Sequence, residues 1–169
     1  MFESITNIFV PKGKEPARIY RTRIGKFQGW VSVIINGILF IIKMGLSLVV
    51  GSISLLADAI HTLSDLISSA VVIWGFNEAE KPADEDHPYG HGRAEYIATL
   101  IIAILLAVAG IEFIESSISR LMNPEPIVSE WWMIGLIGLT ILLKELTARY
   151  GEFLSQKIAS GTLHADAWH

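Results

Sequence analysis

A histidine and an aspartate stand four residues apart in an otherwise apolar stretch, SLLADAIHTLSDLISSAVVIW, as His61 and Asp65. On an α-helix, two residues at this spacing lie on one face, one turn apart. The stretch is apolar enough to lie in lipid, where ionisable side chains are costly and usually mark an ion pathway or a binding site. An imidazole and a carboxylate in this arrangement suit Zn²⁺ or a similar divalent metal. The alternative is a hydrogen-bonded pair that stabilises helix packing.

The composition is that of a membrane protein. Of the 169 residues 51% are hydrophobic, and the mean hydropathy is +0.48. The net charge of −4 says little about partners, because the charges lie mostly between the apolar stretches. The sequence contains no cysteine, so any metal must be bound by His, Asp or Glu. The first 26 residues are polar and basic, and we expect no cleavable signal peptide.

The apolar stretches predict an all-α fold, a polytopic membrane helix bundle. We expect a cytoplasmic N-terminal tail over residues 1–28 and a transmembrane domain over residues 29–169. The domain should contain four complete spans and the start of a fifth, at about 29–50, 55–76, 96–118, 131–149 and 161–169.

Lysine and arginine residues near the spans predict the orientation in the membrane. Ten of the 13 Lys and Arg residues lie in the N-terminal tail and in the two loops on the same side. The links on the opposite side contain only Arg120. We therefore expect an integral, multi-pass protein of a membrane such as the bacterial plasma membrane, with its N-terminus in the cytoplasm.

The depth of the candidate ligands follows from the helical rise. His61 and Asp65 should lie roughly 12 and 18 Å below the outer face, close to the midplane. His169, the last residue of the sequence, enters from the inner side in the segment TLHADAWH and should reach about the same depth. Three candidate ligands from two helices would converge there, where transporters place a site that opens alternately to each side.

Two further charged residues within the predicted spans bear on the site, and the first of them has more than one interpretation. Asp58 lies seven residues before Asp65, only about 20° away around the helix. It either caps the helix or pairs with Lys43, or it lines an outer vestibule and passes metal or protons along. Lys144, near the inner end of the fourth span, is expected to extend its ammonium group to the membrane surface.

Three segments together resemble the cation diffusion facilitator family of divalent-metal/proton antiporters: GSISLLADAIHTLSD, PADEDHPYGHGRAE and HADAWH. The resemblance covers nearly the whole chain from Gly29. It implies a tetrahedral transport site in which His61, Asp65 and His169 match three of four ligands. The fourth ligand, an aspartate, would follow four residues beyond His169. Because the family has six spans and usually a C-terminal cytoplasmic domain, we expect this sequence to be part of a longer protein.

The resemblance also matches Asp84, His87 and His91, in the loop after the second span, to a second metal site of the family. An acidic loop with histidines at the cytoplasmic mouth can capture a cation and raise its local concentration. Pro88 and the neighbouring glycines disfavour a helix, so we expect these ligands on a turn. The alternative is a solvated hydrophilic loop.

The implied function is secondary active export of a divalent metal, first of all Zn²⁺, from the cytoplasm in exchange for protons. Metal and protons compete for the same lone pairs, and this competition provides the coupling. Nitrogen and oxygen ligands without sulfur favour Zn²⁺, with Fe²⁺, Cd²⁺, Co²⁺ and Mn²⁺ as alternatives. We expect a homodimer in the lipid bilayer, with no permanent cofactor and no nucleic-acid partner.

Two other functions remain open at this point. A membrane metalloenzyme would use a three-ligand metal to activate water, but it needs a general base and a pocket for an organic substrate, and the sequence has a signature of neither. A non-transporting scaffold or metal sensor would keep the fold without flux. We expect a transporter and not an enzyme.

Overall fold

The structure, a computed structural model, describes residues 2–13, 16–51, 53–122 and 131–168. Within these ranges all regular secondary structure is helical, which confirms the predicted fold class. The helices are α1 (Phe2–Phe9), α2 (Ala17–Val50), α3 (Ile53–Glu80), α4 (Ala94–Met122), α5 (Trp131–Ile158) and α6 (Gly161–Ala167).

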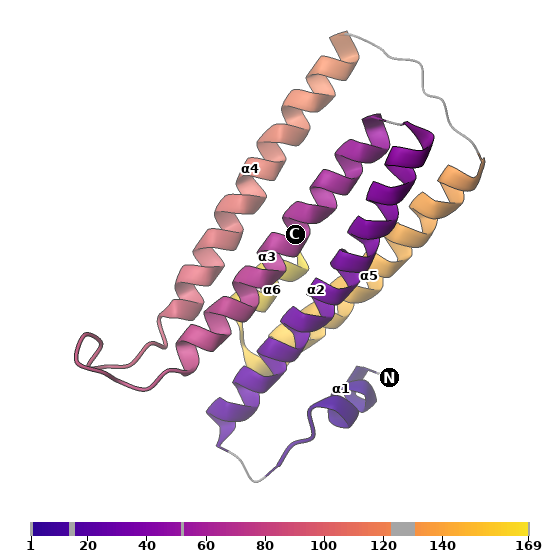
Figure 1. The fold of residues 1–169 in the computed structure, drawn as a ribbon. Helices are drawn as coiled ribbons and strands as arrows, with labels where there is room; N and C mark the ends of the chain where they lie inside the picture. Colours follow the sequence, from indigo (N-terminus) through magenta and orange to yellow (C-terminus); the bar gives the residue numbers. More distant parts are fainter. Residues whose placement is uncertain (1, 14–15, 52, 123–130, 169) are drawn as a thin grey trace.

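The four long helices, α2 to α5, run side by side, and the short α6 lies among them (Figure 1). Among the described residues, α2, α3 and α4 are long and apolar enough to cross a membrane, with mean hydropathies of 2.3, 1.4 and 2.7 over their most apolar windows. The chain is therefore a polytopic membrane helix bundle, and these helices coincide with the first three predicted spans. α5 begins where the fourth span was predicted and continues to Ile158. Its crossing of the membrane stays a prediction.

α2 and α3 form a helical hairpin. α2 begins at Ala17, within the segment expected to be a tail, and Pro16 precedes it with a φ of −55° that suits a helix start. It ends at Gly51, whose φ of +70° lies in the left-handed region and whose N–H donates to the carbonyl oxygen of Ser47 at 2.9 Å. Glycine adopts this conformation without steric cost. Because α3 begins at Ile53, the two helices are antiparallel neighbours.

The helices approach most closely near the α3–α4 loop, where small residues face their neighbours. A Cβ atom on Gly25 of α2 would lie 2.3 Å from Cζ of Phe76, and one on Gly75 would lie 2.5 Å from Cβ of Ala98 on α4. Such contacts are typical of helices packed in membranes. Phe76 is fully buried in a core that also includes Ile24, Val72, Ile102, Leu154 and Leu163.

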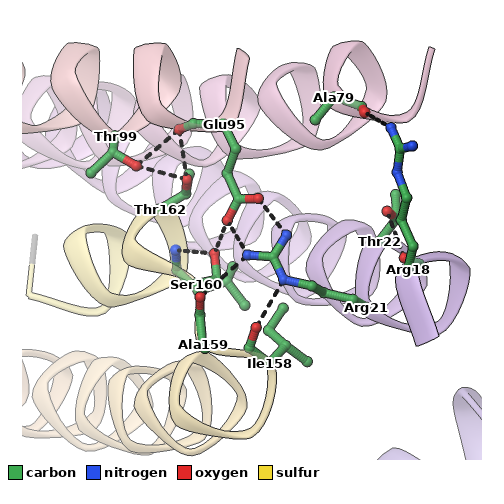
Figure 2. Close-up of polar contacts among 11 residues, drawn as sticks. Arg18, Arg21, Thr22, Ala79, Glu95, Thr99, Ile158, Ala159, Ser160 and Thr162 are labelled. Carbon is green, nitrogen blue, oxygen red and sulfur yellow. Dashed lines mark hydrogen bonds and ion pairs between the residues drawn. The ribbon is translucent and has the colours of Figure 1, made fainter. Parts of the chain in front are cut away.

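A polar network joins four helices at the same end of the bundle (Figure 2). Arg21 of α2 donates two hydrogen bonds to the carboxylate of Glu95 on α4, with N···O distances of 2.5 and 2.7 Å. Its Nε also donates to the carbonyl oxygen of Ile158, at the end of α5, at 2.8 Å. Ser160 Oγ donates to Glu95 Oε1 at 2.7 Å, and Thr162 Oγ1 of α6 donates to the Glu95 carbonyl oxygen at 3.0 Å. Glu95 therefore holds α2, α4 and the α5–α6 junction together.

Replacement of Glu95 by Gln should destabilise the bundle. The substitution keeps the size of the side chain but removes the charge that strengthens the bonds from Arg21 and Ser160. We expect the free energy of unfolding in detergent to fall by about 1–2 kcal/mol, a value reduced for solvent screening of the part-exposed Arg21. The control is Glu80→Gln, which removes a surface ion pair with Lys26. Its effect should stay within about 0.5 kcal/mol, and equal losses in both variants would contradict the role of Glu95.

Candidate functional site

His61 and Asp65 lie on one face of α3, one turn apart, as their spacing predicts. His61 Nε2 is 3.9 Å from Asp65 Oδ1. The side chain of Asp65 is only 6% exposed, whereas that of His61 is 30% exposed and its ring packs edge-on against Phe113 of α4. The hydroxyls of Ser68 and Ser69 donate to the main-chain oxygen of Asp65, at 2.9 and 3.0 Å. The structure thus brings together an imidazole and a buried carboxylate in mid-helix.

Lys144 of α5 contacts Asp65, which is the main difference from the sequence-based expectation. Its Nζ forms an ion pair and hydrogen bond with Asp65 Oδ2. The expectation that this ammonium group extends to the membrane surface is therefore wrong for this structure. The signal was present in the sequence, because Lys144 lies roughly 20 Å along its helix from Trp131, about the depth calculated for Asp65. Attraction between opposite charges in a low-dielectric interior then favours the pair over exposure of the ammonium group.

A cavity of about 370 Å³ opens beside Asp65 and Lys144. α2, α3, α5 and α6 line it, and its polar lining includes Gln28, Ser32, Asn36, Asp65, Ser68, Ser69, Lys144, Glu145, Thr147 and Asp166. Asp166, on α6, accepts a hydrogen bond from Ser32 and shares the hydroxyl proton of Ser69 with the Asp65 carbonyl oxygen, each contact of Asp166 being 3.4 Å long. Sequence reasoning did not single out Asp166, Gln28 or these serines. Their only signal is their position on polar faces of apolar helices, which does not show which of them meet.

Of the three predicted transport-site ligands, the structure describes two. His169 lies outside the described residues, so its placement beside His61 and Asp65 stays a prediction. Figure 1 shows the short helix that precedes it, α6, between the long helices and in contact with α3.

Asp58 pairs with Lys43, one of the alternatives considered for it. The distance between Asp58 Oδ2 and Lys43 Nζ is 2.8 Å, and the same ammonium group donates to Thr62 Oγ1 at 3.0 Å. Lys43 is buried, whereas the side chain of Asp58 is 43% exposed. The pair accounts for the buried lysine, and a vestibule or proton-relay role of Asp58 stays a prediction.

The loop between α3 and α4 gathers Asp84, His87 and His91 in one cluster. Potential ligand atoms of the three side chains lie within 4.8 Å of one another. His87 Nδ1 is 3.3 Å from Asp84 Oδ1, and His91 Nε2 is 3.5 Å from Asp84 Oδ2. The main-chain N–H of His87 donates to Asp84 at 2.6 Å and, as the largest cause, lowers the pKa of this carboxyl below its usual value. Gly90, with a φ of +77°, allows the turn that brings the histidines together.

This loop is non-helical, as predicted, and its three candidate ligands could hold a divalent cation. Asp84 and His87 are exposed, and His91 is partly buried. A charged carboxylate beside two imidazoles is a suitable donor set for Zn²⁺ or a related metal. Metal binding by this loop stays a prediction.

Comparison with known proteins places the chain in a family. The cation efflux transmembrane domain family matches residues 29–169. An uncharacterised transporter of Methanocaldococcus jannaschii is 40% identical over 139 residues, which cover 82% of this chain and 49% of that protein. The manganese efflux system protein MneS of Bacillus subtilis is 33% identical over 147 residues, which cover 85% of this chain and 49% of MneS. The magnetosome protein MamM of Paramagnetospirillum magneticum is 36% identical over 77 residues, 46% of this chain and 24% of MamM.

The chain spans about half the length of the first two of these relatives. The family match covers His61, Asp65 and the Asp84–His91 loop, the segments that carried the resemblance, and confirms it. Cation efflux proteins are multi-pass membrane transporters and not enzymes. The chain belongs to the cation efflux family, whose transmembrane domain matches residues 29–169.

Proposed function

We propose that the protein containing this chain exports a divalent metal cation from the cytoplasm in exchange for protons. The observation that supports this most directly is the buried carboxylate of Asp65, one turn from His61 in a membrane helix and beside a polar cavity. Ionisable groups are expensive in this environment, and a charge that only stabilised packing would not need a cavity beside it. His61 and Asp65, together with His169 and a later aspartate, would bind the transported ion.

Zn²⁺ is our first candidate for the cargo, and Mn²⁺ is the second. The imidazole of His61 favours Zn²⁺ over harder ions. The similarity to MneS, a manganese efflux system protein, supports Mn²⁺. The oxygen-rich lining of the cavity is compatible with either ion.

The proposed orientation places the loop with Asp84, His87 and His91 in the cytoplasm, with α5 as the fourth span. The cluster would then raise the local concentration of cations at the inner mouth of the bundle. Imidazole and carboxylate groups bind metal only in their deprotonated forms. A neutral cytoplasm therefore favours loading, and a more acidic exterior favours release, since protons take the lone pairs that held the metal.

Lys144 adds a step to this exchange. Its ammonium group occupies Asp65 Oδ2, one of the oxygens that the metal would use. Binding of a divalent cation there requires the ammonium group to move away, because two cations cannot share the oxygen without strong repulsion. Lys144 would return when the metal leaves, so that Asp65 keeps a partner in both states.

Removal of either described ligand should stop transport. We expect His61→Ala and Asp65→Ala, each in the full-length protein, to lower Zn²⁺ flux into proteoliposomes to background while membrane insertion stays normal. Parallel measurements with Mn²⁺ decide the cargo. The control is Thr140→Val, which changes a buried side chain of α5 outside the cavity lining and should keep most of the flux. Near-normal flux in both ligand variants would overturn the proposal.

The loop cluster should affect the apparent affinity more than the maximal rate, because it would act before the transport step. We expect the Asp84→Ala, His87→Ala and His91→Ala triple variant to raise the Zn²⁺ concentration for half-maximal uptake into inside-out vesicles by about fivefold. Its charge-matched control is Asp86→Asn, which also removes one carboxylate from the same loop and leaves the cluster intact. A triple variant that is inactive at saturating Zn²⁺ would place the loop in the transport step itself.

Removal of the competing ammonium group should strengthen metal binding. We expect Lys144→Gln to lower the Zn²⁺ dissociation constant of the full-length protein in detergent by about tenfold, which corresponds to about 1.4 kcal/mol. The maximal transport rate should fall, because Asp65 would have no cation to replace the metal. Lys144→Arg keeps the charge and should bind almost normally, and Lys157→Gln on the exposed end of the same helix is the control. An unchanged dissociation constant in Lys144→Gln would show that the pair does not compete with metal.

A further inference from the structure

The cavity contains a second group of oxygen atoms that the proposed transport site does not use. Asp166 of α6 accepts a hydrogen bond from Ser32 of α2 at Oδ2 and one from Ser69 of α3 at Oδ1, both at 3.4 Å. Ser69 follows Asp65 by four residues, toward the end of α3 that carries the Asp84–His91 loop. Asp166 is therefore displaced from Asp65 by about one helical turn, roughly 6 Å, toward the loop side.

Gln28 provides an independent indication of a ligand at this position. Its side chain lines the same cavity and the residue is 1% exposed. Nε2 donates to Ser32 Oγ at 3.3 Å, but Oε1 is buried without a hydrogen-bond partner in the described part of the chain. A buried acceptor without a partner is destabilising, so its presence calls for a polar or charged species in the cavity. Gly151 of α5 faces the Gln28 amide and leaves room for it, because a Cβ at Gly151 would lie only 3.0 Å from Nε2.

The groups that could serve as metal ligands here are a carboxylate, an amide oxygen and two hydroxyls. Hard divalent cations bind such oxygen donors, and a cation that keeps part of its water shell needs few direct bonds. Each carboxylate oxygen of Asp166 can accept more than one interaction, so hydrogen bonds to this carboxylate are compatible with a bound cation. The set contains no imidazole, so it should bind more weakly and less selectively than His61 and Asp65.

We propose that Asp166, Gln28, Ser32 and Ser69 form a second cation position, at which the partly hydrated metal waits on the loop side of Asp65. This inference rests on the proposed export function and adds a step to it. A divalent charge at Asp166 would repel the ammonium group of Lys144 across the cavity. The ion at the second position thereby promotes the separation of Lys144 from Asp65. This separation is needed before the metal can bind at the transport site.

Two substitutions with opposite expected effects test the proposal. The quantity to measure is Zn²⁺ uptake into inside-out vesicles that contain the full-length protein. Asp166→Asn should raise the half-saturating Zn²⁺ concentration about tenfold and change the maximal rate less than twofold. Gln28→Glu adds a carboxylate at the same position and should lower that concentration at least threefold. A merely structural role for Gln28 predicts no gain in affinity from a new charge.

The matched control is Gln156→Glu, which adds the same charge at an exposed position near the C-terminal end of α5, outside the cavity. Its half-saturating concentration should equal that of the unmodified protein. The proposal is overturned if Asp166→Asn has the same half-saturating Zn²⁺ concentration as the unmodified protein. It is also overturned if Asp166→Asn inserts into the membrane normally but is inactive at saturating Zn²⁺. The second result would make Asp166 part of the transport step.

Equilibrium binding of Mn²⁺ to the full-length protein separates this proposal from the export function. The Asp65→Asn protein should keep one bound Mn²⁺ per chain that is lost in the Asp65→Asn and Asp166→Asn double variant. If the single and the double variant bind the same number of Mn²⁺ ions per chain, the second cation position is overturned, whatever the flux measurements show. Undiminished Zn²⁺ flux in Asp65→Asn overturns the proposed transport site and leaves the stoichiometry as the test of Asp166.

Discussion

The buried carboxylate of Asp65 is the constraint on which the rest of the bundle depends. An isolated charge in the interior of a membrane helix bundle is strongly unfavourable, so Asp65 needs either a cation beside it or a bound proton in every stable state. In the present state that cation is Lys144, which joins the middle of α3 to α5. The same requirement makes the position suitable for a metal, since a divalent ion neutralises the carboxylate in place of the ammonium group. A second pair, Lys43 with Asp58, satisfies the same requirement closer to the α2–α3 link.

The two ends of the bundle are built differently. Near the α3–α4 loop, glycine contacts, a buried apolar core and the bonds of Glu95 hold the helices together. Toward the other end, the α4 residues 111–119 are all exposed, and Figure 1 shows this helix apart from α2. Closely packed helices with satisfied polar groups resist separation more than helices in sparse contact. Within the described residues, the end that carries the loop is therefore the fixed end.

Local patterns in the sequence predicted the elements well, because hydrophobic length and helical spacing depend on few residues. The first three apolar runs became α2, α3 and α4, and the spacing of His61 and Asp65 placed them on one face. The turn of the Asp84–His91 loop followed from its proline and glycines. Pairings between distant residues were less accessible. The contact of Lys144 with Asp65 spans 79 residues and depends on how α5 is rotated against α3, which its hydropathy pattern does not fix. The bonds from Asp166 to Ser32 and Ser69 likewise depend on where α6 enters the bundle.

The short length of α6 has a mechanical consequence. Its first turn is attached to α4 through Ser160 and Thr162, which both bond to Glu95, and its last turn carries Asp166. The whole helix has only seven residues, about two turns, so its two ends are rigidly connected. A shift of α4 against α2 must therefore either break the Glu95 bonds or displace Asp166 inside the cavity. The width of the cavity at Asp166 and the hydrogen bonds of Glu95 should therefore change together. A spectroscopic probe attached near either site would report a change at the other.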